Sequence, residues 1–517
     1  MMARLFSFVA LAAVITPTFA AAEPISLAIA STISAVISAG GTFTFLGLSG
    51  IGAIAASVAV RAALGYAINA LTSRGNRVSG GYTVNSIGPA LPHAVIYGET
   101  KVGGAVFYQA TTASGTYGYD EYLHRCIAFA GHEIESFESV WFNDEEITFN
   151  PTTGAVTAPA KWVGLARIKT HLGADDQTAD SDLVAEVTEW TTNHRARGVA
   201  YLYIRFAKTS SSASDTAYKN GLPVVRAVIR GKKVYDQRSD ATAWSANPAL
   251  CLRDYVTADY GLAEDSSQID DALFTTAADI CDETVSGSAR YTCNGAFLLD
   301  AAPDDIVRTT TASMGGMFWY QLGTWACRAA AYVSPTLIFD EDDLRSNLQI
   351  STKHSRLDNF NVVRGVYRGP ETNYQETDFT EVTDATYVAE DNGVAVATDI
   401  PLLFTETDAM AQRIAEIALR RNRKQITVTA AFGLRALDVM VGDTIMLTNA
   451  RAGWTNKIFE CVDWRLGLTG EMDLQVNMIL REASITVFGG VESEPIYDRA
   501  ASAIRDRANA VIYDRAA

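Results

Sequence analysis

Apolar and polar residues alternate along much of the chain between residues 76 and 240. The pattern is clearest in VWFNDEEITFN (Val140–Asn150), GVAYLYIRFAK (Gly198–Lys208) and LPVVRAVIRGKKVYD (Leu222–Asp236). Such alternation, with β-branched and aromatic residues bounded by turn residues, predicts β-strands. Between them, SDLVAEVTEW (Ser181–Trp190) begins with Ser and continues with apolar residues at helical spacing, which predicts a short helix.

The spacing of apolar residues becomes helical between residues 241 and 347. Three segments, NPALCLRDYVT, SQIDDALFTTAADICDE and PDDIVRTTTASMGG, each place Pro, Ser or Asp before a run with helical period. In the first, Asn247 is the expected N-cap and Pro248 the first helical residue, where the missing N–H costs nothing. This region is therefore predicted to be a mostly helical α+β domain.

Strand patterns return after residue 348 and continue to about residue 490. The expected strands lie in FNVVRGVYRG, QITVTAAFG, DTIMLTN, KIFECVDWRLG and MDLQVNMILRE. One helix interrupts them, TDAMAQRIAEIALRRNR (Thr407–Arg423), whose apolar stripe is Met410, Ile414, Ile417 and Ala418. After a Gly-Asp turn, the strand DTIMLTN places Ile445 and Leu447 on one face.

The two ends of the chain are predicted to contact other subunits or a membrane rather than to form hydrophobic cores of their own. Residues 25 to 60 contain no Asp, Glu, Lys or Arg, and a soluble protein does not leave such a stretch exposed. We expect it to form a tip plug or a membrane contact through Phe43, Phe45, Leu46, Gly47, Gly50, Ile51, Ala53 and Ala56. The end of the chain is expected to be a helix whose heptad spacing suits a short oligomer seam of Tyr497, Ala501, Ile504, Ala508 and Val511.

The opening MMARLFSFVALAAVITPTFAAAEP (Met1–Pro24) has the features of a secretory signal peptide, namely one early positive charge, an apolar run and small residues near a cleavage point. The apolar character continues past any cleavage point, however, to Val60. Each apolar lobe, Ile25–Ala39 and Phe43–Val60, is shorter than the roughly 20 residues that a spanning helix needs. Two interpretations, an exported protein and a retained apolar segment, follow from these residues.

Composition and motifs argue against several function classes. The net charge of −17 disfavours a protein that grips nucleic acid through its phosphates. The six cysteines are dispersed without CxxC spacing, which indicates buried thiols rather than a disulfide framework. The sequence has no HExxH, no GxSxG and no calcium-loop spacing around Asp340–Asp343. We therefore expect no enzyme, no cofactor and no metal site.

Two blocks of the sequence resemble a known family. The first is GLPVVRAVIRGKKVYDQRSDATAWSANPALCLRDYVTADYGL (Gly221–Leu262), in which RGKKVYD is followed by a spacer and NPAxxLRDYxxxxYGL. The second is NFNVVRGVYRGPETNYQETDF (Asn359–Phe379), followed by RALDVMVGDTIMLTN (Arg435–Asn449), with YTCNGAF (Tyr291–Phe297) between the blocks. This ordered series, over about residues 80 to 485, resembles the tail tip or hub proteins of long-tailed phages, the lambda-type tip-attachment protein family.

The resemblance implies a structural virion protein, a homotrimeric hub at the tail tip that closes the tail tube and forms the conduit for DNA delivery. It implies two β-barrel-like domains in each subunit and assembly in the host cytoplasm. Its implied partners are other tail proteins (distal tail, tape measure and tip proteins), while DNA passes without sequence-specific binding. Contact with the host envelope through the N-terminal apolar segment is a further expectation. On this interpretation residues 1 to 24 remain on the functional protein.

The pattern and the resemblance together predict an α+β, multidomain fold with β-barrel-like hub domains, a mostly helical middle domain, an apolar N-terminal segment and a C-terminal helix. The expected limits are 1–75, 76–240, 241–347, 348–490 and 491–517. Two other functions stay open. A secreted or outer-membrane binding protein would have its mature start near Ala21 or Ala22. A virion-carried cell-wall hydrolase would need a catalytic constellation that the motifs do not supply.

Overall fold

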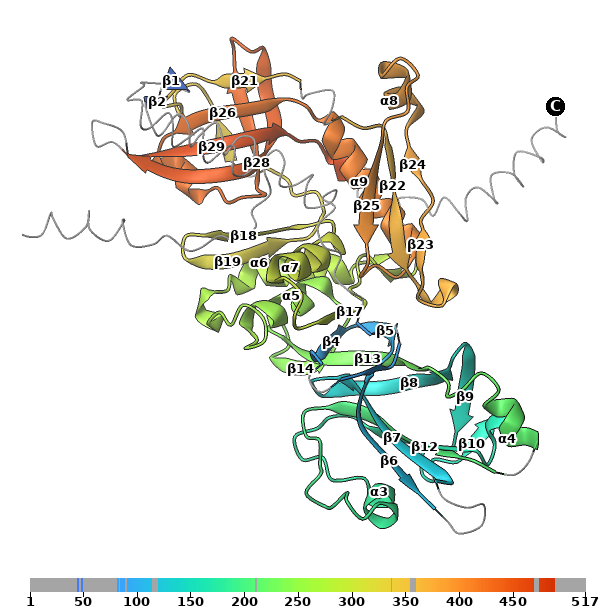
Figure 1. The fold of residues 1–517 in the computed structure, drawn as a ribbon. Helices are drawn as coiled ribbons and strands as arrows, with labels where there is room; N and C mark the ends of the chain where they lie inside the picture. Colours follow the sequence, from blue (N-terminus) through green and yellow to red (C-terminus); the bar gives the residue numbers. More distant parts are fainter. Residues whose placement is uncertain are drawn as a thin grey trace, which may run out of the picture.

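The computed structural model describes residues 81–82, 84–88, 91–113, 120–209, 212–335, 337–353, 359–468 and 474–488, together with two short paired strands, β1 (Thr44–Phe45) and β2 (Leu48–Ser49). The described elements form an elongated arrangement (Figure 1). A β-sandwich lies at one end, a mixed region follows, and two further β-containing parts lie side by side at the other end. The limits of the domains stay a prediction.

The sandwich consists of two sheets that face each other across one apolar core. The first sheet has the order β10-β9-β8-β13-β14, with β5 also pairing with β13. Its strands are β5 (Glu99–Val102), β8 (Ile134–Phe142), β9 (Glu145–Phe149), β10 (Val156–Ala158), β13 (Val225–Asp236) and β14 (Ala241–Trp244). The second sheet, in the order β11-β12-β7-β6-β3, contains β3 (Ser86–Ile87), β6 (Ala105–Thr112), β7 (Tyr122–Ala130), β11 (Ala166–His171) and β12 (Ala200–Ala207).

The sandwich core is made by inward-facing residues of both sheets, among them Phe129, Ile204 and Ile229. Its short helices are η1 (Ala160–Trp162), α3 (Ser181–Glu186) and α4 (Ser212–Ala217). The helix predicted at Ser181 is confirmed, and Asp180, one residue earlier, caps it by accepting a hydrogen bond from the N–H of Leu183.

Barrel closure is not seen in the residues that the structure describes, so the expected β-barrel-like domains are not confirmed. Closing a sheet requires its two edge strands to pair. Here the edges of the first sheet, β10 and β14, do not pair with each other, and neither do the edges of the second, β11 and β3. The long strand β13 instead pairs with β5, β8 and β14, which holds the sheet open and layered.

The middle region contains the three predicted helices, α5 (Pro248–Thr257), α6 (Asp271–Asp282) and α7 (Pro303–Ala312), and a 3-10 turn η2 (Ser266–Gln268). Antiparallel strand pairs accompany them: β4 (Ala94–Tyr97) with β17 (Gly295–Leu298), β15 (Thr284–Val285) with β16 (Ser288–Ala289), and β18 (Met317–Gln321) with β19 (Thr324–Arg328). The prediction of a mostly helical domain is thus not confirmed. The aromatic residues of β18 form a strand that pairs with β19, and the prediction from helical spacing did not include this hairpin.

One of the two remaining parts is a small sheet covered by a long helix. Its strands are β22 (Val362–Arg368), β23 (Glu376–Asp378), β24 (Val382–Thr383) and β25 (Ala397–Leu402), the last parallel to β22. The helices are η3 (Pro370–Thr372), α8 (Ala385–Glu390) and α9 (Asp408–Arg423). The predicted helix α9 is confirmed, with Thr407 as its cap and its apolar stripe buried toward β22.

The other part is a six-stranded sheet in the order β20-β27-β28-β29-β26-β21. Its strands are β20 (Leu337–Phe339), β21 (Gln349–Ser351), β26 (Thr427–Phe432), β27 (Thr444–Asn449), β28 (Trp454–Leu468) and β29 (Leu474–Glu482), accompanied by η4 (Leu434–Asp438) and η5 (Ile485–Phe488). Ile445 and Leu447 both point into the core, as predicted. All six cysteines are buried and free, which confirms the interpretation of dispersed structural thiols.

Candidate functional site

The contact residues predicted from the sequence cannot be placed. Phe45 lies in β1, whose side chains are not described. The remaining expected plug residues and the expected C-terminal seam lie outside the described residues: Phe43, Leu46, Gly47, Gly50, Ile51, Ala53, Ala56, Tyr497, Ala501, Ile504, Ala508 and Val511. Both surfaces therefore stay predictions.

Instead, the described side chains gather into three polar joints between parts of the molecule. We name them by position in Figure 1. The lower joint (Tyr97, Lys232, Asp254, Tyr260) connects the sandwich to the middle region. The lateral joint (Glu99, Asn294, Tyr374, Glu406) connects the sandwich and middle region to the part that contains α9. The upper joint (Arg328, Arg421, Asp443, Glu460, Arg481) connects the middle region, α9 and the six-stranded sheet.

The lower joint is built by the polar positions of the first sequence block. Asp254 of α5 accepts hydrogen bonds at Oδ2 from the hydroxyls of Tyr97 (2.7 Å) and Tyr260 (2.5 Å). Lys232 of β13 lies 3.2 Å from Asp254 Oδ1 and donates to the Tyr260 hydroxyl at 2.9 Å. Burial, with the neighbouring phenol and carboxylate, raises the pKa of Tyr97 well above its ordinary value, so that the hydroxyl stays a proton donor.

The same block fixes α5 and α6 against the strands. Asn247 caps α5 through Oδ1 and donates from Nδ2 to the carbonyl of Ala278 on α6 at 2.9 Å. Arg238, after β13, forms ion pairs with Asp279 and Asp282 of α6. The first block, from RGKKVYD to YGL, is therefore a strand-to-helix junction whose polar residues hold α5 and α6 in place.

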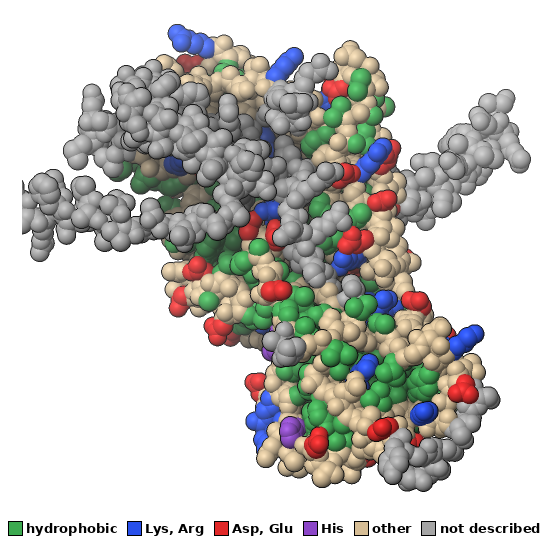
Figure 2. Space-filling model, in the orientation of Figure 1, with side chains coloured by type: hydrophobic (Ala, Val, Ile, Leu, Met, Phe, Trp, Pro, Cys, Tyr) green, Lys and Arg blue, Asp and Glu red, His purple; other side chains and the backbone are tan. Residues whose placement is uncertain are grey.

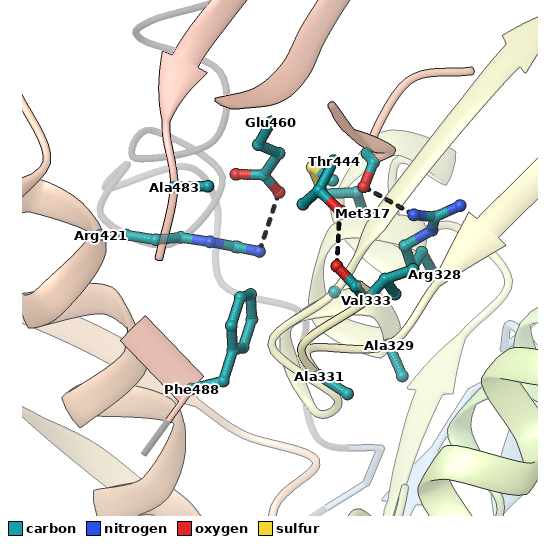
Figure 3. A pocket seen from close by; sticks show the side chains of 12 residues that line it. Met317, Arg328, Ala329, Ala331, Val333, Arg421, Thr444, Glu460, Ala483 and Phe488 are labelled. Atoms are coloured by element: carbon teal, nitrogen blue, oxygen red, sulfur yellow. Dashed lines mark hydrogen bonds and ion pairs between the residues drawn. The ribbon is translucent and has the colours of Figure 1, made fainter. Parts of the chain in front are cut away.

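The upper joint surrounds a small pocket, in which Arg421 and Phe488 project toward Glu460 (Figure 3). Glu460 of β28 accepts from Arg481 of β29 at 2.7 Å and from Arg421 of α9 at 3.2 Å. Burial alone would raise the pKa of Glu460, but the two guanidinium groups outweigh it and hold that pKa below its ordinary value. Glu460 is thus a buried carboxylate held charged between two arginines.

Arg328 of β19 completes the upper joint from the side of the middle region. Its guanidinium donates to the carbonyl of Gly442 and to Asp443 Oδ1, each at 2.6 Å. Nearby, the Thr444 hydroxyl donates to the carbonyl of Val333 (Figure 3). Charged hydrogen bonds of this kind are stronger and more directional than neutral ones. The six-stranded sheet is therefore tied to the β18–β19 hairpin by directed bonds as well as by apolar contact.

The lateral joint contains two carboxylates, Glu99 and Glu406. Asn294 donates to Glu406 Oε2 at 2.7 Å and accepts from the backbone N–H of Glu99 at 2.8 Å. Lys101 donates to Asn373 Oδ1 at 2.6 Å across the same boundary. Burial, and the charge of Glu99, raise the pKa of Glu406. The charged form of Glu406 is therefore disfavoured in the folded chain.

Side chains that could do chemistry are held in structural roles. Burial raises the pKa of Cys126, which removes the thiolate that a nucleophile needs. Burial lowers the pKa of His132 to about 4, and its Nε2 accepts from the backbone N–H of Ile96. His171 pairs with Asp180, the cap of α3, at 2.8 Å. Within the described ranges no group of His, Cys, Asp or Glu is arranged to hold a metal ion, and no helix is long and apolar enough to cross a membrane.

Sequence reasoning missed the partners across the upper joint. Arg420, Arg421 and Arg423 occupy the last turn of α9, at the negative end of its dipole. The helical pattern did not reveal that Arg421 reaches Glu460. The available signal was Glu460 itself, a charged residue between Phe459 and Cys461, which are both fully buried. A carboxylate inside such a strand needs a buried partner.

Comparison with known proteins gives a family match over part of the chain. The model of a family described as "Putative phage tail protein" matches residues 309–460. That range includes the β18–β19 hairpin, α9, and Glu460. Among curated protein sequences, none matches.

Solved structures extend the comparison to the fold of the whole chain. A chain from the virion of a native gene transfer agent particle has a TM-score of 0.56 at 15% identity, and the match covers 92% of this chain and 100% of that one. A tail protein from Neisseria meningitidis MC58 (TM-score 0.31, 11% identity, 77% and 98% covered) and the 43 kDa tail protein of prophage MuSo2 from Shewanella oneidensis (TM-score 0.28, 8% identity, 77% and 100% covered) superpose only loosely. The family match supports the resemblance to phage tail proteins, and a tail protein rather than an enzyme, while the gene transfer agent chain shows a similar fold; neither singles out the lambda-type tip family.

Proposed function

We propose that the chain is a hub protein at the tip of a phage-type tail, where three copies close the tail tube and form the conduit for DNA. The observation that carries the proposal is the ordered series of tip-type blocks from Gly221 to Asn449 in a chain whose fold matches a virion protein over its length. Other tail proteins, namely distal tail, tape measure and tip proteins, are its partners, and assembly takes place in the host cytoplasm.

The three joints support this function physically. A hub has to keep its parts in fixed relative positions while the tube above it is assembled. Asp254, Glu460 and Asn294 each interact across a boundary between parts, with Lys232, Arg421 and Glu406 respectively, in places where side chains are buried or half-buried. Charged hydrogen bonds at such boundaries fix geometry more than they add stability.

The charge of the chain suits a conduit. A lumen that passes DNA must not retain it, and a net charge of −17 gives a surface field that repels phosphate. On this proposal DNA passes without sequence-specific binding. The apolar segment from residue 25 to 60 plugs the tube axis before delivery, with three copies packing through their small residues.

The mass of the assembled protein and its position in the particle test the proposal. Light scattering of the purified full chain, or of hub-containing assemblies, is expected to give three times the 55.7 kDa of one chain. The mass should stay trimeric when residues 495–517 are deleted, because about two heptads are too short to drive association alone. A gold-labelled chain in whole particles should mark one end of the tail. Label along the shaft, or a monomer or dimer mass in assemblies, would overturn the hub.

A further inference from the structure

A long segment covers the outer face of the second sandwich sheet. Strands β11 and β12 pair directly with each other, yet residues 172–199, here called the strap, lie between them in the sequence. Ordered connections longer than about 15 residues are uncommon and usually have a function. Alternate residues of β12 face the sandwich core, and the others face the strap. The buried cluster between strap and sheet contains Cys126, Leu183, Trp190 and Tyr201.

One carboxylate of the strap is shared by several cations of the sheet. Glu186 of α3 lies 2.9 Å from Arg167 of β11 and 3.0 Å from Arg205 of β12. His124 of β7, whose side chain is fully buried, lies 3.8 Å from the same carboxylate. Glu186 therefore faces two permanent cations and one histidine that becomes a third when it is protonated.

The hydrogen bonds of His124 require a neutral ring. Its nitrogens lie 2.8 Å from the Tyr203 hydroxyl and 2.7 Å from the Thr112 hydroxyl. A neutral imidazole accepts one hydrogen bond whichever nitrogen carries the proton, whereas an imidazolium accepts none. Protonation therefore deprives one hydroxyl of its acceptor and places a third cation beside Glu186. The groups that face His124 are Thr112 of β6, Arg167 of β11, Tyr203 and Arg205 of β12, and Glu186 of α3.

Two other histidines at the strap respond to acid in opposite ways. His194 stacks on Trp190, and its Nδ1 accepts from the N–H of Thr191 at 2.9 Å, a bond that an imidazolium cannot make. His171 pairs with Asp180 at 2.8 Å, and a charged ring strengthens this contact. Acid therefore weakens the strap around Trp190 and keeps its beginning attached at Asp180.

We propose that the strap is an acid-released latch, in which protonation of His124 detaches Glu186 and the residues after it and uncovers the aromatic face of the second sheet. Burial lowers the pKa of His124 more than the charge of Glu186 raises it. The contribution of the neutral ring to closure is complete above the ordinary pKa of histidine, about 6.5, and is lost as pH falls through the lower value of the closed form. This inference does not depend on the hub proposal.

The closed strap also leaves polar groups unsatisfied. Among the described residues, the Trp190 Nε1–H and the Tyr201 hydroxyl are buried without a hydrogen-bond partner. Such groups regain hydrogen bonds to water when the cover lifts. The closed state is therefore less stable than its apolar contacts alone would make it, which suits a segment that opens.

The thiol of Cys126 reports opening, because it is fully buried beneath the strap. A dipyridyl disulfide, added to the full chain, forms a mixed disulfide with an accessible thiol and releases one thiopyridine. Mass spectrometry follows this modification relative to that of a free small thiol under the same conditions. The rate at Cys126 should rise by up to about tenfold between pH 6.5 and pH 5.5. Cys461, buried in the core of the six-stranded sheet, should stay unmodified.

The substitution H124Q tests which group carries the switch. Glutamine can accept a hydrogen bond but takes up no proton in this range, so the rate at Cys126 should lose most of its pH dependence. The control H93Q changes an exposed histidine and should leave that dependence intact. A rise at Cys126 that persists in H124Q would overturn the latch. An equal rise at Cys461 in the unsubstituted chain would also overturn it, because the whole chain would then be unfolding.

A second variant gives a result that does not require H124Q to fold. E186Q removes the carboxylate that Arg167 and Arg205 share, so Cys126 should already be modified faster at pH 7.5 than in the unsubstituted chain. The matched control E189Q changes an exposed carboxylate of the same strap and should have no effect. Equal rates at Cys126 in E186Q and E189Q would show that the ion pairs do not hold the strap, and the latch would be wrong.

Discussion

Glu460 is the residue on which the upper joint depends most. Replacing it by Gln keeps the shape but leaves Arg421 and Arg481 buried without a counter-charge. Removing one partner of a buried ion pair costs about 3–5 kcal/mol, so E460Q should strongly lower the free energy of unfolding of this part. Chemical denaturation followed by tryptophan fluorescence measures the loss.

The matched control for E460Q is E482Q, on the next strand. Glu482 pairs with Lys457 at 3.3 Å, and both side chains remain partly exposed. Such a pair is worth less than about 1 kcal/mol. Because the pKa of Glu460 in the folded chain is below its ordinary value, its contribution is complete above that ordinary value and is lost as pH falls through the folded value. Equal losses for E460Q and E482Q at pH 7 would contradict a buried triad.

The pKa of Glu406 in the lateral joint is shifted in the opposite direction from that of Glu460. Its pKa is raised by burial and by Glu99, so the charged form is disfavoured in the folded chain. The stability linked to its protonated form is complete below the ordinary pKa of a glutamate and is lost as pH rises through the folded value. E406Q, which can still accept from Asn294, should therefore stabilise the chain at pH 7.

The E406Q gain should shrink as pH falls and vanish below about pH 3, where Glu406 is protonated in both the folded and the unfolded chain. Unfolding curves at the two pH values measure it, with E381Q as the control. Glu381 pairs with Arg364 on the surface of the same part, both side chains being about half exposed. A gain from E406Q that persists unchanged at acidic pH would show that charge is not its cause.

At the scale of elements, the start of α5 shows how one polar side chain orders two helices. Asn247 accepts from the N–H of Ala249 and donates to Ala278 on α6. N247A removes a cap worth about 1 kcal/mol together with the hydrogen bond to the Ala278 carbonyl, for a total loss of about 2 kcal/mol. D384A, which removes the exposed cap of α8, should cost about 1 kcal/mol or less. If denaturation gives the same loss for both variants, the link to α6 contributes nothing.

Elements of this kind were predictable because their determinants are local. Asn247 and Pro248 define the start of α5, and Ile445 and Leu447 define the buried face of β27, within a few residues of sequence. The stripe of α9 follows from helical period alone. In the middle region the same local reading failed at β18 and β19, because pairing of Tyr320 with Trp325, not propensity, decides that hairpin.

The joints were not predictable because their partners are far apart in sequence. Tyr97 and Asp254 are separated by 157 positions, and Lys101 and Asn373 by 272. Periodicity carries no information about such pairs. The prediction of barrel closure was not confirmed for the same reason, because whether edge strands such as β3 and β10 pair with other strands depends on the whole topology. Only a charged residue inside an apolar strand, such as Glu460, marks a distant partner in advance.

At the scale of the whole molecule, the amount of continuous apolar surface indicates which segment must be covered in the assembled particle. Figure 2 shows apolar side chains scattered among polar ones on the visible face of the described residues. Exposed apolar residues such as Ile87 (71%) and Leu322 (63%) occur singly in many soluble proteins and need no partner. The uncharged stretch of residues 25 to 60 differs in kind, because a continuous apolar segment of that length demands a covering surface.

The plug proposal therefore predicts that charge in this segment spoils assembly. L46D/I51D places two carboxylates among small residues that pack at the tube axis, where an unpaired charge is expensive to bury. Particles carrying it should be lost or should leak DNA, as measured by particle yield and nuclease sensitivity. The control V163D/V394D introduces two charges at apolar residues that are about half exposed and should assemble normally.

Contact of residues 25–60 with a membrane is a separate hypothesis, and liposome experiments test it. A peptide of residues 25–60 should partition into liposomes and release trapped dye, since Phe43, Phe45 and Leu46 can anchor an interfacial segment although each lobe is short for a full span. The same peptide with L46D/I51D should release much less dye, because each charge disfavours transfer into the bilayer. If liposomes stay sealed at micromolar peptide and the L46D/I51D particles fail to assemble, the membrane-insertion hypothesis is wrong and only the plug hypothesis stands. Normal assembly of those particles would remove the plug, because two unpaired carboxylates could not be buried on a shared axis without cost.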